Sequence, residues 1–120
     1  MKIEEWNKLP KDSETDVIAV EGDLVTLIDG IAFLIQRKNN WNNIVCIRVS
    51  PSNRSLVRTF EDFRKFCEEN KIQYIRVEGS NRRTYKMLFL VSRLSDVSNV
   101  IYERTESALY KRNIYYVKTY

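Results

Sequence analysis

Val49-Ser50-Pro51-Ser52-Asn53-Arg54 marks the point at which the chain changes from predicted β-structure to predicted helix. Residues 44–49 are almost continuously apolar, which is typical of a strand buried on both faces. Pro51 cannot donate a hydrogen bond to a neighbouring strand, so the strand must end by this position. The polar residues 50–55 therefore form a loop, and the sequence predicts a helix after it.

The helix after this loop is predicted from the spacing of its apolar residues. Side chains three or four positions apart share one helix face, which we interpret as core. The residues with this spacing are Phe60, Phe63, Phe66 and Cys67. Thr59 is the predicted N-cap, which would place the acidic residues 61 and 62 in the first turn, and Asn70 is predicted to end the helix in a left-handed conformation.

Upstream of residues 49–54, the sequence predicts a β-hairpin. Asp29-Gly30 separates the apolar runs 24–28 and 31–35, and this dipeptide favours a type I′ turn. A short apolar run covers residues 17–20, and the polar cluster 38–43 is predicted to be a loop between the hairpin and the strand 44–49. Residues 1–16 are expected to be an irregular or short-helical lead-in.

Downstream, residues 71–78 alternate as a strand, which we expect to lie parallel to the strand 44–49 through a right-handed crossover. Residues 84–94 are apolar enough for a helix or a strand, and the alternation of strands with helices favours a helix. The β-branched and aromatic runs 100–102 and 114–117 predict a closing antiparallel pair. The predicted fold is a mixed α+β or α/β arrangement in one domain, residues 1–120.

Composition excludes several classes of function. The 120 residues include no histidine, which removes the usual neutral-pH base and the commonest transition-metal ligand. We therefore expect no metal site, and we interpret Cys46 and Cys67 as buried thiols. No apolar run approaches the roughly 20 residues of a membrane helix, and the first residues lack the pattern of a signal peptide. We expect an intracellular protein, cytoplasmic in a bacterium or host cell, without membrane contact.

Two short patterns resemble motifs of a known family. Val49, Pro51 and Arg54 match V-x-P-x-x-R, and Asn81 with Thr84 approximates N-x-x-A. Together with the predicted order of elements over residues 17–120, they resemble the GNAT acyltransferase superfamily. The resemblance implies a GNAT-like twisted mixed sheet with two crossover helices, and a cleft for acyl-CoA between the strands that end near Val49 and Glu78.

The resemblance also implies the residues that would act if the chain is an enzyme. Acetyl-CoA would be held by Arg54, Ser55, Val57, Arg58, Thr59 and Asn81. Glu78 would serve as a general base, directly or through water, and Tyr85 as the acid. Proton transfer by other groups would need Asp, Lys or a further Glu or Tyr.

The chain departs from the family pattern at two positions. The family has a glycine near Val57 and a small residue near Thr59, which let backbone N–H groups close on phosphate oxygens. The family's frequent tyrosine acid falls on Leu88, which cannot protonate a leaving thiolate. These two losses affect cofactor binding and catalysis separately.

Three functions remain open from the sequence. The first, which we favour, is a degenerate GNAT-like module without a cofactor that binds a macromolecular partner or serves as an assembly component. The partner would be a protein rather than a nucleic acid, bound through Arg82, Arg83 and Lys86. The style of the sequence is that of a small phage or viral accessory protein, which could also be associated with a virion. The second is an acyl-CoA N-acyltransferase. The third is a small nucleic-acid binder, suggested by a net charge of +4 and by aromatic residues taken to be exposed. These are Trp41, Tyr110, Tyr115 and Tyr116.

Overall fold

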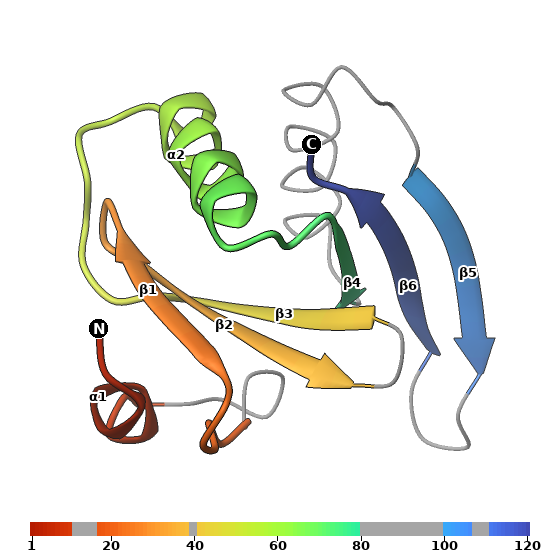
Figure 1. Cartoon of the computed structure of the whole chain (residues 1–120), viewed down its shortest axis with the longest axis horizontal. Coiled ribbons are helices and arrows are strands. Elements are labelled where there is room, and N and C mark those ends of the chain that lie inside the picture. The colour runs from red at the N-terminus through yellow and green to blue at the C-terminus, as the bar shows by residue number, and fades with distance from the viewer. Residues whose placement is uncertain (11–16, 39–40, 80–99, 107–110) are drawn as a thin grey trace. The chain divides into compact units, whose positions relative to one another are not determined.

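The computed structural model describes residues 1–10, 17–38, 41–79, 100–106 and 111–120, with the backbone alone for residues 38, 77–79, 100–106 and 111–117 (Figure 1). These residues form two compact units, Met1–Ser55 and Leu56–Tyr120, which we describe one at a time. Both units contain a helix and antiparallel strands, so the fold class is α+β. No helix in the described ranges is long and apolar enough to cross a membrane.

Unit 1 contains a three-stranded antiparallel arrangement. Its elements are α1 (Ile3–Asn7), β1 (Leu24–Ile28), β2 (Ile31–Lys38) and β3 (Trp41–Arg48). β2 pairs with β1 on one side and with β3 on the other. Between β1 and β2, Asp29 and Gly30 have φ angles of 49° and 78°, the two positive values that a type I′ turn requires. The predicted hairpin is confirmed.

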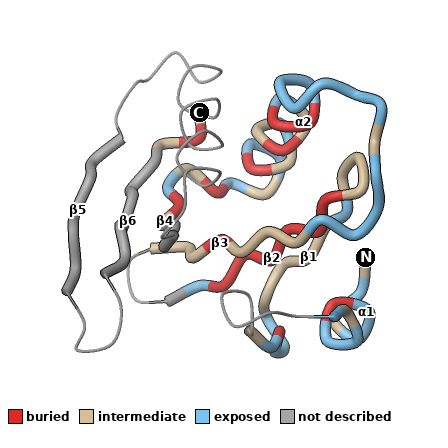
Figure 2. The backbone as a smooth tube through the Cα atoms, turned by 180° about the vertical axis from the view of Figure 1, so that it is seen from behind, coloured by how far each residue is buried: buried red, intermediate tan, exposed pale blue. Residues whose placement is uncertain are grey.

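Two predictions about β3 are wrong. The polar cluster 38–43 is not a separate loop, because Lys38 ends β2 and Trp41 begins β3 directly opposite it. The ladder uses backbone groups, so polar side chains at its end do not interrupt it. The strand buried on both faces is not residues 44–49, of which only Ile44 is buried, but β2, where residues 31–36 are all buried (Figure 2). Within unit 1, β2 is the middle strand, between β1 and β3.

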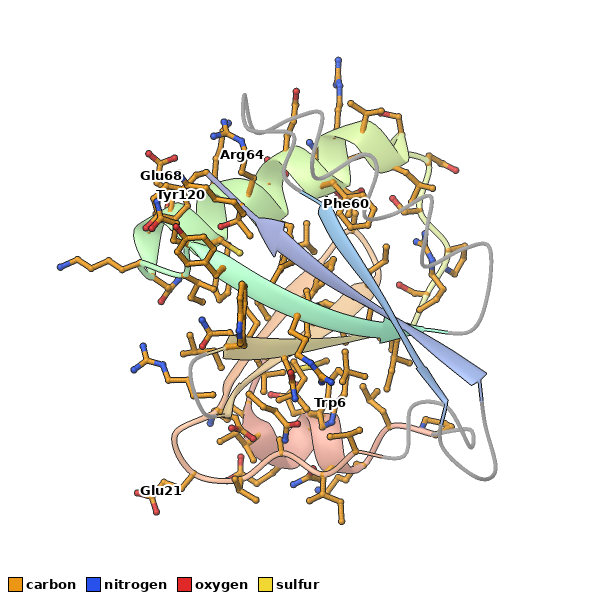
Figure 3. All side chains as sticks on the ribbon, turned by 90° about the vertical axis from the view of Figure 1, so that its right-hand side faces the viewer. Trp6, Glu21, Phe60, Arg64, Glu68 and Tyr120 are labelled. Carbon is orange, nitrogen blue, oxygen red and sulfur yellow. The ribbon has the colours of Figure 1, made fainter. Side chains whose placement is uncertain are left out.

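Trp6 is the centre of the core of unit 1 (Figure 3). It is fully buried with Ala19, Ala32 and Leu34. The indole Nε1 donates to the carbonyl of Val17 over 2.9 Å. The lead-in therefore contributes a core side chain, which the sequence analysis did not predict.

The apolar run 17–20 is extended but pairs with no strand in the described part of unit 1. Side chains satisfy its backbone instead. Asn7 donates from Nδ2 to the carbonyl of Ala19 over 3.0 Å, and the N–H of Ala19 donates to Asn7 Oδ1 over 2.8 Å. Gln36 donates to the carbonyl of Ile18 over 3.2 Å. These bonds fasten the run to α1 and β2.

Unit 2 contains one helix and three described strands. They are α2 (Leu56–Glu69), β4 (Tyr74–Gly79), β5 (Val100–Glu106) and β6 (Lys111–Lys118). β6 lies between β4 and β5 and is antiparallel to both. The predicted closing antiparallel pair is confirmed, although both strands are longer than the apolar runs that predicted them. Residue Thr119 follows β6 and is fully buried; its N–H donates to the carbonyl of Gln73 over 2.7 Å, and its hydroxyl donates to the carbonyl of Ile72.

The predicted start of α2 is wrong. The helix begins at Leu56, so Thr59 lies within the first turn, where it is buried, and the first turn contains no acidic residue. Ser55, another residue type suited to capping, immediately precedes the helix. The buried face is as predicted for Phe60, Phe63 and Cys67. Phe66, also predicted to be core, is half-buried.

The predicted end of α2 is wrong by one residue. Lys71, with φ of 57°, is the left-handed residue, and Asn70 instead donates from Nδ2 to the carbonyl of Phe66 over 2.8 Å. The N–H of Ile72 donates to the carbonyl of Cys67 and the N–H of Lys71 to that of Glu68, the two bonds of a Schellman motif. This ending occupies residues 70–72, and the strand predicted over residues 71–78 begins at Tyr74.

Two fold predictions are untested. The helix predicted over residues 84–94 lies outside the described residues. The parallel pairing of residues 44–49 with 71–78 would join the two units and stays a prediction.

Candidate functional site

The best-defined polar cluster of unit 1 lies where the loop after β3 meets the turn of the hairpin. We call it the turn cluster: Asp29, Gly30, Arg48, Ser50 and Arg54. The carbonyl of Gly30 accepts hydrogen bonds from the N–H groups of Val49, over 2.7 Å, and Ser50, over 3.2 Å. A Cβ atom on Gly30 would lie 2.2 Å from the carbonyl oxygen of Ser50, so only glycine permits this approach.

Arg54, the residue expected to hold a phosphate of acyl-CoA, is paired with Asp29 in the turn cluster. Its Nη1 lies 3.1 Å from Oδ2 and 3.2 Å from Oδ1 of Asp29. Arg48 donates from Nη1 to the carbonyl of Asp29 over 3.2 Å. The Arg54 side chain is 44% exposed, so the pair stabilises the fold only weakly. Its main effect is to place a carboxylate on the guanidinium that a phosphate would use.

The other predicted cofactor residues lie at the start of α2. Ser55, Val57 and Arg58 are exposed, whereas Thr59 is buried and presents no side chain to a ligand. Val57 lies inside the first helical turn and needs no glycine-like conformation there. Leu56 and Val57 expose 45% and 42% of their surface, so the helix begins with two apolar side chains in water.

Most of the remaining predicted site residues cannot be placed. Asn81, Arg82, Arg83, Tyr85, Lys86 and Leu88 lie outside the described residues. Glu78 lies in β4, opposite Ile114 of β6, with its backbone alone described. Trp41, taken to be exposed, is half-buried at the start of β3. Whether Glu78 and Tyr85 lie near each other therefore stays untested.

The two cysteines lie in separate units, and neither forms a disulfide. Cys67 is buried, as expected, whereas Cys46 is half-buried. Desolvation still raises the pKa of each thiol to about 12. Both are therefore neutral thiols at physiological pH and unsuited to nucleophilic catalysis. Within the described ranges, no group of three or more Cys, Asp or Glu residues is arranged to hold a metal ion.

We expect both thiols to react slowly in the folded protein because the thiolate is the reactive form. A rise of about three pKa units lowers the thiolate fraction at pH 8 roughly a thousandfold. Alkylation with iodoacetamide, followed by mass spectrometry, should label both cysteines quickly in urea and hardly at all without it. Rapid labelling of Cys67 in the native protein would contradict its burial.

The raised pKa values of the two thiols also make the free energy of unfolding depend on pH. A thiol with a raised pKa contributes its stability fully below the unfolded value, and this contribution is lost as pH rises from that value toward about 12. The free energy of unfolding should therefore fall above pH 9.

The pairing of Arg54 with Asp29, and the hydrogen bond from Arg48 to the carbonyl of Asp29, were not predicted from the sequence. Asp29 lies 25 positions before Arg54, and its role in the turn already accounted for its presence in the sequence. No local pattern indicates the pair.

Comparison of the chain with protein-family models, curated proteins and solved structures found no match.

Proposed function

We propose that the chain is a degenerate GNAT-like module that binds a protein partner and does not transfer acyl groups. The observation that carries the proposal is the ion pair between Arg54 and Asp29. A pyrophosphate at this position would have to share the Arg54 guanidinium with the carboxylate of Asp29 or compete with it. The negative charge of Asp29 therefore disfavours an anionic cofactor at this arginine.

The resemblance to the superfamily is supported by the order of elements. A hairpin and a third strand precede a helix, a strand and a closing antiparallel pair, as the resemblance implies. The start of α2 differs in chemistry from a phosphate site, because exposed Leu56 and Val57 would have to lie against an anion. Apolar side chains of this kind are better suited to contact with another protein.

One observation favours a second candidate function, that of an acyl-CoA N-acyltransferase. α2 begins directly after Arg54 and Ser55, so the first N–H groups of the helix, which have no acceptor within the helix itself, follow the arginine closely in the chain. This is the order of groups that the resemblance implies for pyrophosphate binding. The two candidates differ in whether acetyl-CoA binds at all.

Calorimetric titration with acetyl-CoA at low salt separates them. We expect no saturable heat for the wild-type chain, and no acetyl transfer to amines or proteins. Micromolar binding that is weakened by Arg54→Ala but unchanged by Lys65→Ala would overturn the proposal. Lys65 is a suitable control because it is an exposed cation on α2, away from the helix start.

A capture experiment tests the binding half of the proposal. The wild type and an Arg82→Ala/Arg83→Ala variant serve as bait at low and high salt, with Lys65→Ala as the control and nuclease treatment in a parallel sample. We expect a protein partner that is lost at high salt and in the double variant. Loss after nuclease treatment would instead favour the nucleic-acid binder.

A further inference from the structure

β1 leaves one backbone edge without a strand partner in the described part of the chain, since it pairs only with β2. Ile28 and Ile31 flank the two-residue turn, so they exchange hydrogen bonds, and the alternation of an antiparallel pair continues from there. Thr26 also faces β2 with its backbone groups. Val25 and Leu27 therefore direct their N–H and C=O groups outward.

This edge lacks the features that usually prevent strand addition. Natural edges carry charged residues, proline, bulges or a cover, whereas Leu24–Ile28 reads LVTLI and contains none of the first three. Leu27 is 50% exposed. The run 17–20 differs, because Trp6, Asn7 and Gln36 already occupy backbone groups there. The outer edge of β1 can therefore accept another strand.

The edge is complementary to itself. If two copies of β1 run antiparallel about a two-fold axis at Thr26, Val25 of each copy lies opposite Leu27 of the other. Both residues direct backbone groups outward, so the pairing provides four hydrogen bonds. Thr26 faces its own counterpart at the non-hydrogen-bonded position, where side chains are closest.

Charge supports the same arrangement. The chain before β1 carries the acidic Glu21 and Asp23, and Glu21 points away from the ribbon (Figure 3). Arg37 of β2 lies at the same end by its register, so these three side chains sum to one negative charge. At the other end Arg48, the last residue of β3, and Arg54, in the loop after it, lie beside Asp29 of the turn, which leaves one positive charge in excess. Antiparallel pairing brings the acidic end of one copy to the basic end of the other, which is electrostatically favourable.

We propose that two copies of the chain associate through β1 into a symmetric dimer, in which the strands of the two copies of unit 1 form one continuous antiparallel sheet. The proposal does not depend on the proposed function. Because the interface centres on a five-residue strand, the dimer forms at high protein concentration and dissociates on dilution.

Sedimentation velocity over a concentration series tests the dimer. The wild type should approach twice the 14.3 kDa mass of one chain. Thr26→Lys and Thr26→Glu should each weaken association at least about tenfold, because like charges then face each other. An equimolar mixture of the two variants should restore the dimer. Glu69→Gln, which changes the net charge as Thr26→Lys does at an exposed site on α2, should leave it unchanged.

A second measurement uses the wild type alone. Amide hydrogen exchange at Val25 and Leu27 should slow as protein concentration rises, whereas exchange at Lys65 should not change. A chain that stays monomeric throughout, or a dimer that ignores the charge exchange at Thr26, would overturn the proposal. Slow exchange at Val25 and Leu27 in a strictly monomeric sample would also overturn it, because another part of the chain would then cover the edge.

Discussion

Trp6→Ala should lower the free energy of unfolding by about 3–5 kcal/mol, the range for truncating a large buried aromatic side chain. The indole is fully buried among Ala19, Ala32 and Leu34, and its removal leaves a cavity and an unpaired carbonyl at Val17. Since a domain of this size is stabilised by only about 5–15 kcal/mol, α1 then contributes a large part of the total. Urea denaturation followed by circular dichroism measures the loss.

Two further variants separate the causes of this loss. Trp6→Phe keeps an aromatic ring but removes the hydrogen bond to Val17, and should cost clearly less than the alanine variant. Lys8→Ala changes an exposed residue next to the same helix and should be nearly neutral. An unfolding midpoint of Trp6→Ala equal to that of wild type would show that α1 is not part of the core.

Phe63→Ala should destabilise the protein by about 3–5 kcal/mol as well, because this ring is fully buried on α2 between Phe60 and Cys67 of the same face. Phe66→Ala is the matched control: it makes the same chemical change on the same helix at a half-buried position. The control should cost distinctly less. If the two variants shifted the urea midpoint equally, the assignment of the buried face of α2 would be wrong.

Features that depend on neighbouring residues could be predicted from the sequence. Asp29-Gly30 specifies a type I′ turn through two adjacent positive φ angles, and both are observed. The spacing of Phe60, Phe63 and Cys67 likewise specifies one helix face. In each case the determining residues lie within one turn or one helix of each other.

Boundaries were harder to predict because two residues of similar chemistry competed. Ser55 and Thr59 are both suited to capping, and acidic residues follow only the second. The structure starts the helix after Ser55, and Thr59 lies four positions before Phe63 on the buried face. Burial of Thr59 in tertiary structure therefore outweighed the favourable local pattern.

Contacts between distant residues could not be predicted at all. Trp6 is bonded to Val17 across a polar segment with no periodicity, and Arg54 is paired with Asp29 from another element. A motif in the sequence indicates which residue type occupies a position. Whether that side chain is available to a ligand depends on the residues that pack against it. For this reason the sequence predicted Arg54 as a phosphate ligand but not its ion pair with the carboxylate of Asp29.

The order of strands in unit 2 has a consequence for folding during synthesis. β5 pairs with β6 alone among the described strands, so it has no neighbour until residues 111–118 have left the ribosome. The buried Thr119 then fastens the connection after α2. The strand pairs of unit 1, in contrast, use residues 24–48 and are available much earlier. A ribosome-bound chain would thus carry a formed hairpin sheet while β5 still has no strand to pair with.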